Sequence, residues 1–217
     1  MFNMDFSKKV IINTSEENWV DSPENGVKRI PLQREEKESG LTTSVVEYKK
    51  GASFKTHSHP QGEEIFVLEG IFSDEYGDYK AGTYIRNPPG SSHTPFSKDG
   101  CKIFVKLNQM DNNDISRVVV DTTQNNWSPG HGGLKVFPLH SFGTEGTALV
   151  KWPAGERFMK HTHFGGEEIF VLSGEFMDEH GKYPHGTWIR SPHMSIHDPY
   201  VKEDTIIFVK TGHLSKL

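Results

Sequence analysis

The sequence contains only one cysteine, Cys101, among its 217 residues. A single cysteine excludes an intramolecular disulfide and any zinc or redox site that is built from paired cysteines. A metal site in this chain would therefore have to rest on histidine and carboxylate side chains. The chain has twelve histidines, which makes such a site worth searching for.

Long hydrophobic runs and a dominant charge are also missing. No window approaches the roughly 18 uninterrupted apolar residues of a membrane span, and the first residues resemble neither a signal peptide nor a transit peptide. The formal net charge is −5, and both signs are mixed along the chain, so there is no basic stripe for nucleic acid and no cationic face for lipid. We expect a cytoplasmic protein with no nucleic-acid or membrane partner.

No long segment has the periodicity of a helix. The 21 glycines and 12 prolines are spread singly between short apolar segments, a pattern that is typical of strands joined by tight turns. We therefore expect an all-β fold, a sandwich or a small barrel. The strands expected in the first half of the chain are 27–32, 42–48, 53–59, 63–70, 82–87 and 101–107.

One internal repeat covers most of the chain. Residues 51–70, GASFKTHSHPQGEEIFVLEG, return as 155–174, GERFMKHTHFGGEEIFVLSG, with identity at 12 of 20 positions and an offset of 104. Two units of about 110 residues follow, each the size of a domain. We place the first at 1–113 and the second at 114–217.

The repeat extends into the N-terminal part of each unit, where the offset changes. Residues 10–19 match residues 118–127 at an offset of 108. The difference in length falls mainly in the charged segment 33–40 of the first copy, which we expect to be an exposed turn.

A pair of histidines separated by one residue begins a strand in each copy. Successive side chains of a strand alternate between its faces, so His57 and His59 point the same way and can hold one ion. Glu63 adds the negative charge that two neutral imidazoles lack, and His93 is the candidate fourth ligand. The matching residues of the second copy are His161, His163, Glu167 and His197. We predict one divalent metal ion in each unit.

Other polar residues have weaker signals. The matched pairs Arg86 with Arg190, Tyr84 with Trp188, and Lys106 with Lys210 are the best candidates for catalytic groups, but strand-end packing and surface charge are the preferred interpretation. The six remaining histidines are expected to be surface or turn residues: His131, His140, His180, His185, His193 and His213.

Both copies resemble the cupin family in two motifs. The first copy has the cupin spacing at Gly51, His57, His59, Glu63 and Gly70, and again at Gly82, Pro88, Gly90 and His93. The second copy keeps the pattern except that Met194 replaces the glycine that matches Gly90, and we expect a backbone conformation there that methionine disfavours. The resemblance implies two tandem jelly-roll β-barrels, a bicupin, with the three histidines and the glutamate of each copy as metal ligands.

The stretch 62–93 looks most like the cupin of ChrR-type anti-sigma factors, which are zinc proteins that help to sense oxidative stress. This resemblance implies zinc as the preferred metal, with iron, manganese or nickel as alternatives. The helical sigma-binding domain of those regulators, with its own His and Cys ligands, has no counterpart in this sequence. We therefore expect a zinc protein that responds to a small molecule or an oxidant, without sigma-factor sequestration.

Two alternatives stay open. Other bicupins and cupin dioxygenases use the same ligands with iron, manganese or nickel and leave positions for dioxygen and substrate, which implies a dioxygenase acting on a small diketone, phenolic or thiol. In the third hypothesis, one unit is a platform for homodimer formation.

Overall fold

The computed structural model describes residues 1–124 and 126–214 of the chain. These residues form strands and turns, and none of them lies in an α-helix. Accordingly, no described segment is a helix that could cross a membrane. The all-β prediction is confirmed.

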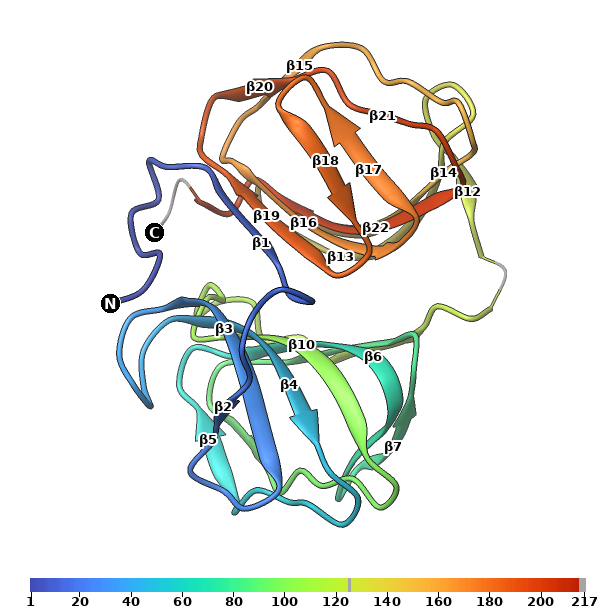
Figure 1. Ribbon diagram of the computed structural model, residues 1–217. Coiled ribbons are helices and arrows are strands. Elements are labelled where there is room, and N and C mark those ends of the chain that lie inside the picture. Colours follow the sequence, from blue (N-terminus) through green and yellow to red (C-terminus); the bar gives the residue numbers. More distant parts are fainter. Residues whose placement is uncertain (125, 215–217) are drawn as a thin grey trace. The chain divides into compact units, whose positions relative to one another are not determined.

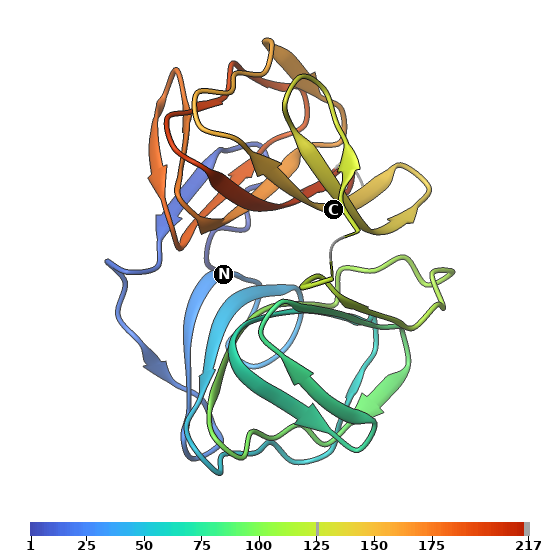
Figure 2. The same cartoon turned by 90° about the vertical axis from the view of Figure 1, so that its right-hand side faces the viewer.

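The chain divides into two compact units. Unit 1 contains residues 1–4 and 18–124, and unit 2 contains residues 5–17 together with the described residues from 126 onward. In both views the strands of each unit lie around one interior (Figure 1, Figure 2).

Unit 1 is built on a large antiparallel sheet with the strand order β11-β8-β6-β10-β4-β3-β2, and β7 pairs with the end of β6. A separate pair, β5 and β9, completes the unit. The strands are β2 (Val20–Asp21), β3 (Val27–Arg34), β4 (Thr42–Tyr48), β5 (His57–His59), β6 (Glu63–Asp74), β7 (Gly77–Lys80), β8 (Thr83–Asn87), β9 (Ser91–His93), β10 (Cys101–Leu107) and β11 (Val118–Asp121).

Unit 2 repeats this plan with the order β1-β19-β16-β22-β14-β13-β12, the pair β15-β20 and the three-stranded sheet β18-β17-β21. Its strands are β1 (Val10–Asn13), β12 (Ser128–Pro129), β13 (Lys135–Phe142), β14 (Glu145–Trp152), β15 (His161–His163), β16 (Glu167–Ser173), β17 (Glu175–Asp178), β18 (Gly181–Pro184), β19 (Thr187–Ser191), β20 (Ser195–His197), β21 (Tyr200–Val201) and β22 (Thr205–Thr211).

Each unit has an edge strand that comes from the other sequence repeat. β1 pairs with β19 in unit 2, where Figure 1 shows it in blue beside the orange strand, and β11 pairs with β8 in unit 1. The matched segments 10–19 and 118–127 thus supply equivalent edges, one to each unit. The division at residues 113 and 114 follows the order of the repeats, whereas the compact units exchange these segments.

The alternation of side chains along β6 determines which groups face the interior. Ile65 and Val67 belong to the buried core of unit 1, and Glu63, two residues before Ile65, shares their face. Glu64 lies on the opposite face. The same alternation in β16 puts Ile169 and Val171 in the core of unit 2.

Two expected boundaries are wrong. The sequence predicts a strand over the whole segment 53–59, but only its last three residues form one, β5. The charged segment 33–40 is not all turn, because β3 continues to Arg34 past a bulge between Pro31 and Gln33, and Gln33 is fully buried. The exposed residues are 35–39.

Met194 has the strained backbone that the comparison of the two copies predicts. Its φ is 65°, and that of the matching Gly90 is 80°, both in the left-handed region that costs a side chain about 1–2 kcal/mol. The side chain of Met194 is half exposed, so little packing offsets this cost.

We expect Met194→Gly to stabilise unit 2 by about 0.5–1 kcal/mol, because relief of the strain outweighs the extra entropy of glycine in the unfolded chain. Thermal unfolding measures the change. Gly90→Met is the matched reverse variant, since a Cβ at Gly90 would meet no atom within 4 Å, and it should destabilise unit 1 by a similar amount. Equal stability of all three proteins would contradict this account.

Candidate metal centres

The pairing of β5 with β9 brings three histidines of unit 1 together. His57 lies opposite His93, and His59 lies opposite Ser91. The three imidazole ring centres are 4.7 to 5.1 Å apart. Both short strands therefore present their rings to one point in the interior.

Glu63, the first residue of β6, faces these rings. Its Oε2 lies 3.6 Å from Nε2 of His59 and 3.4 Å from Nε2 of His93. Asn87, its cross-strand neighbour on β8, donates a hydrogen bond of 2.9 Å from Nδ2 to the same oxygen. The carboxylate is thus fixed in the interior next to the imidazoles.

The second ring nitrogen of each histidine is already engaged. Nδ1 of His57 lies 2.9 Å from the Lys55 carbonyl oxygen, and Nδ1 of His59 lies 3.2 Å from Oγ of Ser91. Nε2 of His59 and Nε2 of His93 are buried without a hydrogen-bond partner. Burial also lowers the pKa of His59, which keeps its ring in the neutral form that binds metals.

These four residues fit a divalent cation. Each offers one ligand atom, and the four atoms all lie within 4.8 Å of one another. Partnerless buried nitrogens beside a buried carboxylate are what a bound cation would satisfy, and three imidazoles with one carboxylate suit zinc, iron, manganese or nickel. The residues that hold such an ion in unit 1 would be His57, His59, Glu63 and His93.

Unit 2 brings the matching histidines together in the same way. His161 lies opposite His197 in the β15–β20 pair, and with His163 their ring centres are 4.5 to 4.9 Å apart. Their ligand atoms also lie within 4.8 Å of one another. Burial lowers the pKa of His163 to about 3, so this ring is neutral at physiological pH.

Glu167 is held less firmly than Glu63. Its Oε2 lies 3.5 Å from Nε2 of His163 and 3.7 Å from that of His197, but the residue is outside the group of three mutually close ligands. Ser191 takes the place of Asn87 in the cross-strand pair, and Oε2 of Glu167 has no hydrogen-bond partner. Burial raises the pKa of Glu167 to about 7. The two candidate centres therefore differ in their carboxylate.

An aspartate supports the last histidine of the site in unit 1. Oδ2 of Asp74 lies 3.2 Å from Nδ1 of His93, and Oδ1 accepts a hydrogen bond of 3.0 Å from Tyr79. Burial by itself would raise the pKa of Asp74, but these hydrogen bonds hold it below the ordinary value. Tyr79 in turn accepts a hydrogen bond of 2.8 Å from Arg117, just before the exchanged strand β11.

Unit 2 has the same arrangement with a lysine. Asp178 lies 3.6 Å from Nδ1 of His197 and accepts a hydrogen bond of 2.7 Å from Tyr183. Lys9, just before the exchanged strand β1, donates a hydrogen bond of 3.0 Å to Asp178. The sequence contains the signal for these supporting residues, because both acids and both tyrosines recur at the offset of 104 and the two cations at 108.

A cavity of about 410 Å³ in unit 1 reaches the candidate centre. His57, His59 and Glu63 form part of its wall. The volume is sufficient for a small organic molecule. A ligand in this cavity would therefore lie next to the metal.

Some sequence-based interpretations of polar residues are wrong. Arg86, Arg190, Lys106 and Lys210 are buried rather than surface charges, and Arg86 pairs with Glu64 at 3.0 Å and with Asp114 at 2.5 Å. These strand positions lie on the face away from the interior, yet they are covered, and Lys210 also forms a buried ion pair, with Glu145 at 3.7 Å.

His213 is also not a surface residue. It is buried, and its Nε2 lies 3.1 Å from Oε2 of Glu168.

Comparison with known proteins connects the fold to a family. The family model described as the ChrR Cupin-like domain matches residues 7–111 and 115–215. Among curated proteins, no sequence match is found.

Several solved structures match nearly the whole length of the chain. A protein from Nostoc punctiforme, provisionally described as a dioxygenase, superposes with a TM-score of 0.77 at 16% identity, covering 97% of this chain and 85% of that one. Protein Ylba from E. coli gives a TM-score of 0.73 at 15% identity, covering 97% and 93%. The bacterial pirin YhhW from E. coli, in complex with nickel(II), gives 0.72 at 11% identity, covering 94% and 98%. At these identities the likeness shows the fold alone, and the prediction of two tandem cupin jelly-roll units is confirmed.

We expect His59→Ala and His163→Ala each to remove about one equivalent of bound metal, because each deletes a central ligand from one of two separate centres. Elemental analysis of the purified variants measures the content. His180→Ala, which removes an exposed histidine of unit 2, should leave it unchanged. Unaltered metal content in both of the first two variants would refute the assignment.

Glu63→Gln should weaken metal binding by more than about tenfold, because it removes a charged ligand. Glu64→Gln should leave metal affinity unchanged and instead lower the free energy of unfolding by about 1.5–3 kcal/mol, since Glu64 accepts a hydrogen bond from Tyr84 and pairs with Arg86. Competition with a chromogenic chelator and denaturant unfolding measure the two quantities. The opposite order of metal affinities would make Glu64 the ligand.

Proposed function

The chain belongs to the family of ChrR Cupin-like domains, and from this premise we propose that it is a divalent-metal protein whose first unit binds a small molecule beside the metal. One observation carries the proposal: the cavity of unit 1 has three of the four candidate ligands in its wall. A metal that only held the fold together would need no such access.

The cavity wall offers a ligand both polar and apolar contacts. Ser44 lines the cavity, and its buried hydroxyl has no hydrogen-bond partner, so a polar ligand atom could supply that partner. Val46 and Phe54 supply an apolar surface that would displace water from the site. A bound metal would act as a Lewis acid on an oxygen of the ligand.

We propose zinc as the metal and a response to a ligand or an oxidant as the role. The family membership and the histidine-rich donor set favour this form of the proposal. An oxidant would act at the metal centre rather than at Cys101, because burial raises the pKa of that thiol to about 11 and the thiolate is the reactive form.

A dioxygenase is the second candidate. The cavity beside the candidate centre would admit an organic substrate, and a protein of the same fold is provisionally described as a dioxygenase. Iron, manganese or nickel would then replace zinc, and the substrate would be a small diketone, phenolic or thiol.

The experiment compares zinc-loaded and iron-loaded protein. Removal of zinc by a chelator should lower the melting temperature, since metal at about 1,000 times its Kd contributes ~4 kcal/mol per site to stability. Peroxide should lower it too, and neither form should consume oxygen continuously with a diketone, phenol or thiol.

Turnover by the iron form at about 1 s⁻¹ or faster would establish the dioxygenase instead. Protein that retains no divalent metal, and melts at the same temperature with and without chelator, would refute both candidates.

A further inference from the structure

Two arginines of β3 face the same cavity as the candidate metal ligands. Arg29 lies opposite Val46 on β4, and Arg34 lies opposite Thr42 on the same strand. All four residues line the cavity of unit 1. The two arginine side chains are only 13% and 15% exposed. Neither arginine lies among the four candidate metal ligands.

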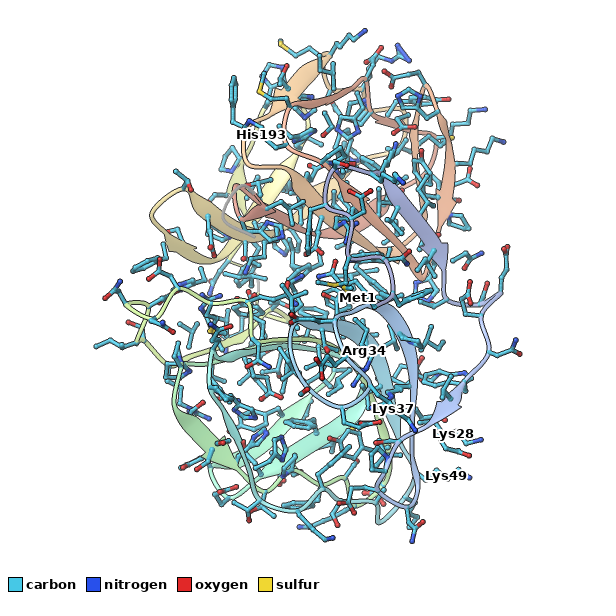
Figure 3. All side chains as sticks on the ribbon, turned by 90° about the vertical axis from the view of Figure 1, so that its left-hand side faces the viewer. Met1, Lys28, Arg34, Lys37, Lys49 and His193 are labelled. Atoms are coloured by element: carbon cyan, nitrogen blue, oxygen red, sulfur yellow. The ribbon has the colours of Figure 1, made fainter. Side chains whose placement is uncertain are left out.

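The two guanidinium groups share one carboxylate. Arg29 makes a double hydrogen bond to Glu38, of 2.9 and 2.6 Å, whereas Nη2 of Arg34 is 3.9 Å from that carboxylate. Arg34, the last residue of β3, donates a hydrogen bond from Nε to the carbonyl oxygen of Lys37. Both residues are labelled in Figure 3. Within the described part of the chain, neither Nη group of Arg34 makes a hydrogen bond. Burial, together with the charge of Arg29, lowers the pKa of Arg34, which is the mark of a cation that lacks a full counter-charge.

The fold itself does not require this pair. In unit 2 the matched cross-strand pairs are Val136 with Val150 and Ser141 with Gly146, so neither arginine has a cationic counterpart. The loop that carries Glu38 spans seven residues, 35–41, between β3 and β4, whereas only two residues, 143 and 144, join β13 to β14. The arginines and their loop are thus present in the first copy alone.

We propose that the cavity of unit 1 takes a small organic carboxylate, which binds to the Nη groups of Arg34 and the hydroxyl of Ser44. A carboxylate matches the planar pair of Nη donors and supplies the missing negative charge. Ser44 is buried, without a partner, and lies in the same wall. Glu38 keeps Arg29 occupied and repels a second carboxylate at close range. The proposal rests on the ligand site of unit 1 and names its ligand class.

The test is calorimetric titration of zinc-loaded protein with acetate, malonate and benzoate, with the amide of each acid as the neutral counterpart, and with inorganic phosphate. At least one carboxylate should bind, and its amide should bind more weakly by about tenfold or more, as expected for a hydrogen bond to a charged group. Phosphate that binds with no carboxylate binding would overturn the ligand class.

Four variants locate the site. Arg34→Ser, which installs the residue of unit 2, should weaken carboxylate binding about tenfold or more, and Arg34→Lys should fall between it and the parent. Glu38→Gln should strengthen binding, because it removes the competing carboxylate, whereas a merely structural loop would lose affinity. Lys102→Ser removes a partly exposed cation of β10 that pairs with Glu69 outside the cavity wall and should change nothing.

The metal content of each variant separates two kinds of failure. Protein with zinc in unit 1 that binds amides as well as carboxylates, or whose carboxylate affinity survives Arg34→Ser, overturns this inference and leaves the ligand site standing. Protein that holds no metal in unit 1 overturns the proposed function itself.

Discussion

Buried imidazole nitrogens that lack a partner in the protein are the constraint on which unit 1 depends. An unsatisfied buried polar group costs about 1–3 kcal/mol, and Nε2 of His59 and Nε2 of His93 are both in this state beside Glu63. The surrounding contacts all keep these atoms pointed inward: Nδ1 of each ring is engaged elsewhere, and Asn87 holds the carboxylate. A cation at their common point would convert this cost into binding energy, which is why metal binding is central to the function that we propose.

The two units apply one scaffold to two different sites. Both units have the same sheet plan, a histidine strand pair and a supporting aspartate. In each, the exchanged segment also supplies a cation, Arg117 in unit 1 and Lys9 in unit 2. Their carboxylates differ because Asn87 in unit 1 is Ser191 in unit 2. The unit 1 cavity also has Arg29 and Arg34 in its wall. The ligand site that we propose is therefore in unit 1, and unit 2 holds a related candidate centre without these arginines.

The sequence was sufficient for the strands, the repeat and the histidine clusters, because strand alternation and turn glycines act locally. Most expected strands agree with β3, β4, β6, β8 and β10 to within a few residues. The exchange of β1 and β11 could not be predicted, since either edge would satisfy the same apolar pattern. The burial of Arg86 could not be predicted either, because strand periodicity does not reveal whether an outward face stays covered. His213 follows the end of β22, where no periodicity indicates whether a side chain is buried. The sequence does contain a signal for Asp74 and Asp178 as supporting residues, because they occupy matching positions in the repeat.

X-ray absorption spectroscopy of zinc-loaded protein tests the central claim most directly. In a variant that retains only the first centre, the account predicts nitrogen or oxygen neighbours at about 2.0–2.1 Å, with the outer-shell scattering of three imidazoles and no sulfur. A spectrum with sulfur in the first shell, or with one imidazole or none, would contradict it.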